Sequence, residues 1–328
     1  MKKYLKDLEE ELRKNNLSEE EIEEILADHE EMIETAKKEG LSEDELNAKF
    51  GDPKDVAEEL SDFSEQADDT KNEDKENKKR KNKQIVFEGV NENYGVSISL
   101  VNEDLRIQPT EEDKITVEYV GRIDISKYDI GFKSNEFYLK SPKRLLNNYF
   151  NITRQIKFII HLPKNKKIED LKIKLVNGDA KLKEIFSSKI EFETTNGDLK
   201  LENLNTKEFK LKVINGDVSI ETVNCESLKI STISGDFNIK KLKVKKDIFV
   251  NTVSGDMKIT DSECAEISLK TVSGDIKGNE FYPAKIALSS VSGDIKIINT
   301  DETRPIQITK ERTVTGDIDI ILKQKKIK

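Results

Sequence analysis

A Gly-Asp dipeptide recurs at almost constant spacing through the C-terminal half of this 328-residue sequence. The successive intervals between its glycines are 19, 19, 19, 20, 19, 19 and 23 residues. A fixed period of this length marks an internal repeat, in which each unit buries its apolar side chains against its neighbours. The eight repeated glycines are Gly178, Gly197, Gly216, Gly235, Gly255, Gly274, Gly293 and Gly316.

Apolar residues occupy fixed places within each unit. They lie seven and five residues before the glycine, as at Leu171 and Ile173, and again two and four residues after it, as at Leu199 and Leu201. Most residues between these places are Lys, Glu, Ser or Asn. Alternation with period two predicts two short strands per unit, each with one buried side.

Two architectures fit this pattern. In a parallel β-solenoid, each unit is one coil and equivalent residues stack about 4.8 Å apart. In an antiparallel meander, Asn-Gly would form a two-residue hairpin turn. We favour the solenoid, because a meander tolerates variable loops and needs a second layer over its apolar face. The predicted fold is mainly β, a parallel β-solenoid (β-helix) of about eight 19-residue coils with a small N-terminal α-helical bundle.

The two cysteines test the solenoid. Cys225 and Cys264 each follow the glycine of their unit by nine residues, but they belong to units two apart. Stacking would hold them about 9.6 Å from each other. A disulfide cannot span that distance, so the solenoid predicts two free thiols.

Three segments with different patterns divide the chain. Residues 1–64 predict a small acidic helical bundle, with apolar residues at helical spacing and capping signatures at Ser18 and Ser42. Residues 65–84 carry no apolar residue larger than alanine and predict a disordered charged linker. Residues 85–328 predict a β-repeat domain, made of an irregular β lead-in over 85–165 and regular coils over 166–328.

Charge and hydropathy exclude several classes of protein. Residues 1–67 carry 9 Lys and Arg against 23 Asp and Glu, which argues against nucleic-acid binding by the helical segment. No stretch approaches the roughly 18 apolar residues of a membrane helix, and the N-terminus lacks the apolar core of a secretory signal. The expected location is therefore cytoplasmic, with a cell-surface association as the alternative.

The repeated aspartates would form a column of like charges. The first interpretation is a turn motif, in which glycine adopts a positive φ and the flanking side chains bond nearby backbone N–H groups. A second is a calcium ladder, since calcium prefers several oxygen ligands. A third is a carbohydrate-cleaving pair of carboxylates. The column comprises Asp179, Asp198, Asp217, Asp236, Asp256, Asp275, Asp294 and Asp317.

No other residues suggest catalysis. His29 and His161 have no nearby set of Cys, His or Asp that would make a metal site, and both are expected to be structural or solvent-facing. The sequence has no phosphate-cradling glycine loop, no G-x-S-x-G and no C-x-x-C. We expect no catalytic residue, no cofactor and no resident metal.

Two family resemblances follow from quoted motifs. The lead-in DLRIQPTEEDKITVEYVG, the strand FIIHLPKNKKIEDLKIKLVNGD and the serial TVSGDI phrases resemble the bacterial "putative adhesin" β-strand repeat family, a domain of unknown function that includes LiaX-like C-terminal domains. That resemblance implies a β-solenoid and roles at the cell envelope. The segment LKDLEEELRKNNLSEEEIEEILADHEEMIETAKKEG, with its F-G-D-P turn at Phe50 to Pro53, resembles the HAAS domain found beside PadR-type transcription regulators.

These features together predict a non-enzymatic interaction protein. In this hypothesis the helical domain docks a protein partner, such as a PadR-type regulator or an envelope component, and the solenoid is a binding scaffold in envelope-stress sensing or regulation. One alternative is a surface adhesin that binds glycan or host protein. Another is a polysaccharide-cleaving β-helix enzyme.

Overall fold

The computed structural model describes residues 2–15, 19, 22–23, 25–27, 29–30, 33, 52–54, 56–57, 81–121, 125–142 and 156–322. Two compact units divide the chain: Met1–Lys81 with Lys143–Tyr149, and Asn82–Pro142 with Phe150–Lys328. The first strand, β1 (Lys81–Phe87), begins within the segment predicted as a linker, and the rest of that segment lies outside the described residues. The predicted domain boundaries therefore stay a prediction.

The helical unit contains α1 (Lys2–Lys14). Tyr4, Leu8 and Leu12 are buried along one side of this helix, which confirms most of the predicted apolar stripe. Further helical residues supply more of this core at Ile22, Ile33, Val56 and Ala57. The helix expected after the capping signature at Ser42 lies outside the described residues. Within the described part of the chain, we find no helix with the length and apolar character needed to cross a membrane.

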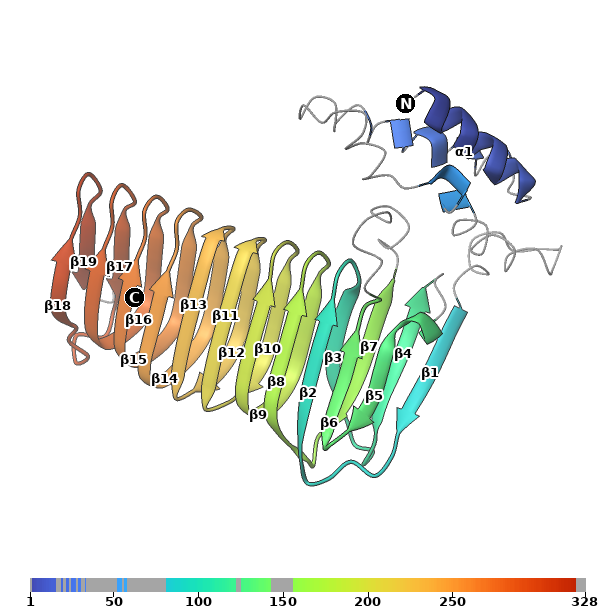
Figure 1. Cartoon of the computed structure of the whole chain (residues 1–328). Helices are drawn as coiled ribbons and strands as arrows, with labels where there is room; N and C mark the ends of the chain where they lie inside the picture. Colours follow the sequence, from blue (N-terminus) through green and yellow to red (C-terminus); the bar gives the residue numbers. More distant parts are fainter. Residues whose placement is uncertain are drawn as a thin grey trace, which may run out of the picture. The chain divides into compact units, whose positions relative to one another are not determined.

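In its described residues, the second unit consists of strands and one short 3-10 helix (Figure 1). The later strands β9, β14, β15 and β16 each run for 14 or 15 residues. The elements after β1 are β2 (Asn93–Leu100), β3 (Asp104–Thr110), β4 (Ile115–Gly121), η2 (Ile125–Lys127), β5 (Asp129–Lys133), β6 (Glu136–Lys140), β7 (Lys157–Pro163), β8 (Lys167–Leu175), β9 (Ala180–Thr194), β10 (Leu199–Asn205), β11 (Glu208–Asn215), β12 (Val218–Cys225), β13 (Ser227–Ser234), β14 (Phe237–Asn251), β15 (Met257–Lys270), β16 (Ile276–Ser289), β17 (Ile295–Asn299), β18 (Gln307–Arg312) and β19 (Ile318–Leu322).

Strand pairing organises this unit into two faces. The first face contains, in order, β1, β4, β7, β3, the start of β9, β10, β12, the starts of β14, β15 and β16, then β17 and β19. The second face contains β5, β6, β2, β8, the end of β9, β11, β13, the ends of β14, β15 and β16, and β18. The long strands cross from one face to the other within a single coil.

Neighbouring coils pair in parallel with one repeat as the offset. Leu199 pairs with Val218 on the first face, and Phe209 pairs with Leu228 on the second. The described repeat strands pair in parallel, and the antiparallel pairs β4 with β7 and β5 with β6 belong to the lead-in. This confirms the solenoid of about eight coils and removes the meander.

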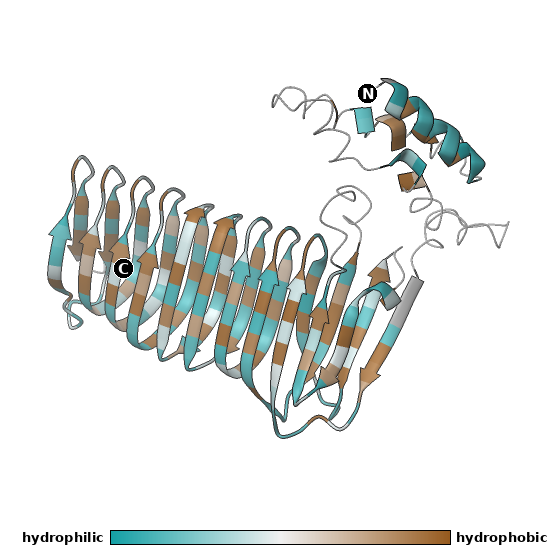
Figure 2. Ribbon diagram, in the orientation of Figure 1, coloured by the Kyte–Doolittle hydropathy of each residue, from teal (hydrophilic) through white to brown (hydrophobic). Residues whose placement is uncertain are grey.

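The apolar positions predicted from the repeat are buried between the two faces. Leu171, Ile173, Leu199 and Leu201 are at most 2% exposed, and apolar equivalents are similarly buried through Ile295 and Ile297, whereas Ile318 and Ile320 of the last coil are only partly buried. Figure 2 shows apolar and polar residues alternating along these strands. A second inward row was not predicted: it lies seven residues after each glycine, as at Leu204. The narrow core therefore has more layers than the sequence pattern indicated.

A second bend recurs six residues after each of the first six repeat glycines. There the backbone is left-handed at Asn203 (φ 55°) and at Thr222 (φ 60°), among others. None of the residues at this bend is glycine, although a positive φ is strained for residues with a Cβ. The full set is Glu184, Asn203, Thr222, Lys241, Asp261 and Glu280. This bend starts the passage of the chain from the first face to the second.

A buried carboxylate is fully hydrogen-bonded within the lead-in. Glu103 is 0% exposed. It accepts hydrogen bonds from the backbone N–H groups of Val101 and Asn102 and from the hydroxyls of Ser141 (2.9 Å) and Tyr128 (2.8 Å). Burial, and next the Glu103 charge, raise the pKa of Tyr128 above its usual value, so that phenol stays a donor.

Candidate functional site

The predicted aspartate column forms a continuous hydrogen-bonded ladder. Oδ1 of Asp179 accepts the backbone N–H of Asp198 at 2.8 Å, and Oδ1 of Asp198 accepts that of Asp217 at 2.9 Å. The same bond repeats to Asp317 with distances between 2.8 and 3.1 Å. Asp104, whose Oδ1 accepts the N–H of Asp179 at 3.0 Å, is a further rung. The structure therefore brings together all eight predicted aspartates and adds one.

These bonds give the turn interpretation a specific geometry. Each carboxylate accepts a nearby backbone N–H, and that N–H belongs to the next coil. The N–H of Asp294, and next the hydrogen bond from Lys277, hold the pKa of Asp275 below its usual value. Burial raises the pKa of Asp104, an effect that the N–H of Asp179 opposes. The column thus links successive coils while most of its carboxylates stay exposed.

The ladder borders a groove of about 790 Å³ on the first face. Its lining combines the aspartates with lysines such as Lys181, Lys200 and Lys258, and with buried residues such as Leu199 and Val218. Across the described part of the chain, no three or more His, Cys, Asp or Glu side chains group closely enough to hold a metal ion. The calcium ladder stays a hypothesis to be tested.

Close contact between coils explains the repeated glycine. A Cβ on Gly235 would lie 2.1 Å from the carbonyl oxygen of Gly216, and φ at Gly235 is +118°. Real Cβ atoms do not come that close to a backbone atom, and L-residues avoid this φ. Six of the eight repeat glycines have a positive φ, the exceptions being Gly293 and Gly316. The expected positive φ is therefore confirmed at six turns, and close packing holds at all eight.

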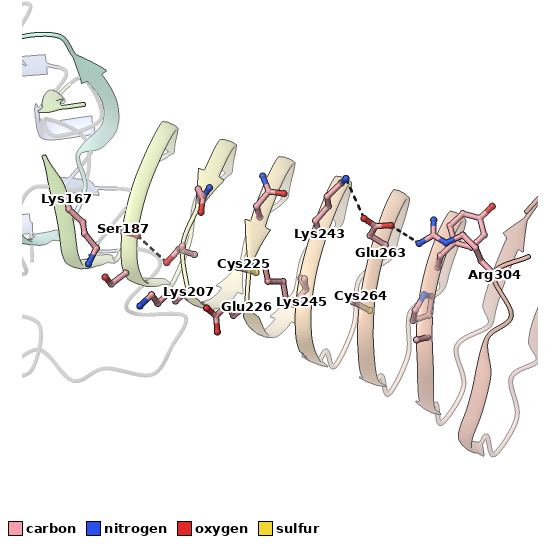
Figure 3. Close-up of a pocket in the computed structure, with 18 of the residues that line it drawn as sticks. Lys167, Ser187, Lys207, Cys225, Glu226, Lys243, Lys245, Glu263, Cys264 and Arg304 are labelled. Carbon is pink, nitrogen blue, oxygen red and sulfur yellow. Dashed lines mark hydrogen bonds and ion pairs between the residues drawn. The ribbon is translucent and has the colours of Figure 1, made fainter. Parts of the chain in front are cut away.

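A larger groove, of about 960 Å³, lies where the chain turns from the first face to the second (Figure 3). We call it the corner groove. Its floor is the residue nine positions after each glycine, and its walls are the residues on either side of that position. The floor residues are small and buried: Ser187, Thr206, Cys225, Val244, Cys264 and Pro283.

Both cysteines lie on this floor as free thiols, as predicted. Val244 separates them, since it pairs with Cys225 on one side and Cys264 on the other. Burial raises the pKa of each thiol to about 12, so both remain protonated at neutral pH. A protonated, buried thiol acts as a small apolar residue rather than a nucleophile.

Ion pairs neutralise the acidic groups of the corner groove. Glu263 contacts Lys243 at 3.5 Å and Arg304 at 2.7 Å, and the Arg304 guanidinium lies 4.3 Å from the centre of the Tyr282 ring. Glu226 contacts Lys246 at 2.8 Å. The cationic side chains Lys207 and Lys245 also line the groove. Its walls are therefore polar with an excess of positive charge, above a floor with little polarity.

The histidines lie in ordinary structural contacts. Nε2 of His161 is 3.0 Å from Oε1 of Glu118, and its Nδ1 is 3.4 Å from the amide of Gln108. Nδ1 of His29 lies 2.8 Å from the carbonyl oxygen of Ile25, and its ring stacks with Tyr4. Neither contact creates a catalytic or metal-binding arrangement.

The turn edge carries an exposed apolar row that our sequence analysis missed. The residue two positions before each glycine is Val, Ile or Thr, and its exposed fraction ranges from 45% at Val272 to 71% at Val314 in the last four coils. The signal was present in the repeated T-V-S-G-D phrase, where the valine alternates with a buried threonine. Thr195 and Ile214 are half-buried members of this row, and its exposed members are Val176, Ile233, Val253, Val272, Val291 and Val314.

Comparisons with solved structures find several at low identity. A "putative adhesin" from Bacteroides fragilis is 17% identical, with 73% of this chain and 96% of that chain covered and a TM-score of 0.43. A "putative lipid binding protein" from Parabacteroides distasonis is 13% identical, with coverage of 74% and 98% and a TM-score of 0.48. A "putative adhesin" from Parabacteroides merdae is 15% identical, with coverage of 74% and 98% and a TM-score of 0.38. No curated protein matches the chain.

Family models match both units of the chain. Residues 3–59 match the HAAS model, which agrees with the resemblance of the acidic helices. Residues 95–250 and 245–328 match the Toastrack model DUF4097, which covers most of the β unit and more than half of the sequence. With its stacked coils, its Gly-Asp turns and these matches, the chain belongs to the Toastrack DUF4097 family.

Proposed function

We propose that this protein is a non-catalytic adaptor, in which the solenoid holds a ligand along the corner groove and the helical unit docks a protein partner. The observation that carries this proposal is the corner groove itself. It crosses successive coils, has a volume of about 960 Å³, and keeps its floor in register from coil to coil. Long surfaces made by stacked repeats are suited to binding extended partners.

The chemistry of the candidate residues supports binding rather than catalysis. A hydrolytic pair of carboxylates needs two different environments, so that one acts as acid and the other as base or nucleophile. Successive carboxylates of the ladder make the same bond to the next coil, as Asp198 and Asp217 do. The thiols of Cys225 and Cys264 are held in the unreactive protonated form. The polysaccharide-cleaving alternative therefore lacks support from these residues.

The helical unit supports the docking half of the proposal. Its match to HAAS and its excess of acidic residues favour a protein partner, such as a PadR-type regulator or an envelope component. On α1, exposed charges form pairs such as Arg13 with Glu9 at 3.0 Å, which leaves a polar outer side above a buried stripe. A role in envelope-stress sensing or regulation, with the protein on the cytoplasmic side, follows from this interpretation.

Cross-linking followed by affinity purification tests the docking role. We expect the full chain and the groove variant Asn224→Trp to recover the same protein partner. A chain that lacks residues 1–80 should lose that partner, because the docking surface is gone. Equal recovery by the shortened chain would contradict the proposal.

The surface-adhesin alternative makes a different prediction about location. Its support is the long corner groove, whose polar walls could equally bind a glycan outside the cell. Protease treatment of intact cells separates the two: the adaptor should be protected, with a cytoplasmic protein as the internal control. Digestion of the protein on intact cells would favour the adhesin.

Calcium binding to the ladder can be tested by thermal unfolding. A ligand that binds only the folded protein must raise the unfolding midpoint. Because one oxygen of each repeat carboxylate from Asp179 to Asp294 already accepts a backbone N–H, we expect millimolar calcium to leave the midpoint unchanged, as magnesium should. A calcium-specific rise that disappears in the double variant Asp217→Asn, Asp236→Asn would establish the calcium ladder instead.

A further inference from the structure

The central part of the corner groove offers polar side chains that have no hydrogen-bond or ion-pair partner among the described residues. Lys207 and Lys245 line one wall and are exposed, and no ion pair joins either to a described residue. Asn205 and Asn224 line the other wall, and their side-chain amides make no hydrogen bond within the described residues. Two ammonium groups and two amides therefore face a groove whose floor here is Cys225 and Val244. Glu226 lies on the same wall between the two lysines, and its charge is compensated by the ion pair with Lys246 at 2.8 Å.

The spacing of these groups fits a linear polymer. Asn205 pairs with Asn224 in adjacent coils, so the two amides are one coil apart, about 4.8 Å. Lys207 and Lys245 are two coils apart, so about 9.6 Å separates their backbone positions. An extended acidic chain whose alternate units present their carboxylates on the same side can reach both lysines. Its intervening hydroxyl groups can reach the amides.

Peptides and nucleic acids suit this groove less well. A peptide that adds a strand needs a free sheet edge, but on the groove floor Val244 is already paired on both sides, with Cys225 and Cys264. Single-stranded nucleic acids bind through bases stacked on aromatic rings. The aromatic ring in the groove lining, Tyr282, is 9% exposed and is covered by Arg304.

We infer that the corner groove binds a linear acidic polysaccharide, whose carboxylates pair with Lys207 and Lys245 and whose hydroxyls bond Asn205 and Asn224. The flat, weakly polar faces of its sugar rings would lie on the floor at Cys225 and Val244. This inference rests on the proposed binding function and names the class of ligand. It requires no covalent step.

Titration calorimetry on the full chain tests the inference, with polygalacturonate as the probe. The matched control polymer is fully methyl-esterified polygalacturonate, which keeps the sugar backbone and loses the charge. We expect the acid form to bind and the ester to bind at least about tenfold more weakly. Binding of the acid form should also weaken with added salt, because salt screens exposed charges.

Two pairs of lysine substitutions locate the site. The double variant Lys207→Gln, Lys245→Gln should weaken binding at least about tenfold. The double variant Lys212→Gln, Lys229→Gln removes the same charge from exposed positions on the second face and should bind as the unmodified chain does. All four positions are exposed, so unchanged circular dichroism and melting should accompany these variants.

The remaining outcomes separate the inference from the function on which it rests. No binding of polygalacturonate, equal binding of its ester, or equal loss in both lysine pairs would overturn the acidic-polysaccharide inference. If the ester binds and Asn224→Trp abolishes that binding, the groove is a binding site for a neutral glycan, and the proposed function survives. If the acid polymer binds, and neither Asn224→Trp nor the double variant Lys207→Gln, Lys245→Gln weakens its binding, then the acidic-polysaccharide inference and the proposed binding function of the groove are both wrong.

Discussion

At each repeat turn the backbone of one coil lies directly on the glycine of the next. This contact leaves no room for a methyl group at Gly235, whose Cβ position is 2.1 Å from the carbonyl oxygen of Gly216. The position also requires a φ of +118°, which L-residues avoid. Glycine is therefore required twice over, by conformation and by space.

Replacing Gly235 by alanine should destabilise the protein by more than about 2 kcal/mol, because strain and a backbone clash act together. Gly89→Ala is the matched control. Its φ is +71°, but nothing lies within 4 Å of the Cβ position, so the loss there should be about 1 kcal/mol. Urea unfolding of both variants measures the difference. Equal losses would show that conformation alone explains the glycine.

The second bend gives a different prediction, because its residues are strained without being glycine. Thr222 is β-branched and has a φ of 60°, whereas Asn203 holds the same place in the preceding coil at 55°. Asparagine tolerates this conformation better than threonine. Thr222→Asn should therefore raise stability by about 0.5 to 1 kcal/mol, and Asn203→Thr should lower it by a similar amount. Thermal unfolding of the two variants checks the signs, and a change in the same direction for both would contradict the argument.

The aspartate ladder links successive coils, because each carboxylate accepts a hydrogen bond from the backbone of the next coil. Its anionic form is the acceptor of the bond, so protonation weakens it. The pKa of Asp275 is lowered by the N–H of Asp294 and by Lys277. A carboxyl group whose folded pKa is depressed contributes stability above its unfolded pKa and loses that contribution as the pH falls through the folded pKa.

Stability should therefore decline as the pH falls from about 4 toward 2. In Asp275→Asn the decline should be shallower over that window, because the side chain no longer titrates while its oxygen can still accept the N–H. Urea unfolding at a series of pH values measures both slopes. Asp104, whose pKa is raised by burial, works in the opposite sense: its protonated form is favoured by folding, and this contribution is lost as the pH rises through the folded pKa. If the unfolding free energy has the same pH dependence in the unmodified chain and in Asp275→Asn, then Asp275 does not contribute to the loss of stability at low pH.

The sequence predicted the coil register well, because the Gly-Asp spacing repeats with the coil. The same spacing placed Cys225 and Cys264 two coils apart and gave the aspartate ladder its members, except Asp104. Asp104 was missed because Glu103, rather than glycine, precedes it. At this one rung the carbonyl of Glu103 lies beneath Gly178, 2.4 Å from its Cβ position.

The second bend and the corner groove could not be predicted from residue type. The bend includes Glu184, Thr222 and Lys241, which share no side-chain chemistry, so their common backbone conformation leaves no signal in the sequence. The groove floor is defined by small size and includes both Ser187 and Pro283. A hydropathy pattern does not detect small side-chain size, because small residues can be polar or apolar. The wall residues come from different coils, and they form one groove only because the coils stack.

For the whole molecule, the coil is the cooperative unit. Equivalent residues on adjacent coils pair with an offset of one repeat, as Leu199 does with Val218. Deleting residues 198–216 removes one whole coil and joins Gly197 to Asp217, so every inward position is kept. We expect this variant to fold with a lower melting temperature and a smaller urea m-value, because less surface is buried. Deleting residues 198–207 should prevent folding of the repeat, since it shifts the following coil out of register. Similar circular dichroism melts for the two deletions would contradict this model.

Each coil contributes one residue to the floor of the corner groove, so the length of the groove is set by the number of coils. Tandem duplication of a 19-residue unit would extend it by one strand spacing, about 4.8 Å, without a new design for its walls. The length of oligosaccharide that such a protein binds would then depend on its number of coils. Relatives with more or fewer repeats should differ in the chain length they select before they differ in the sugar they recognise.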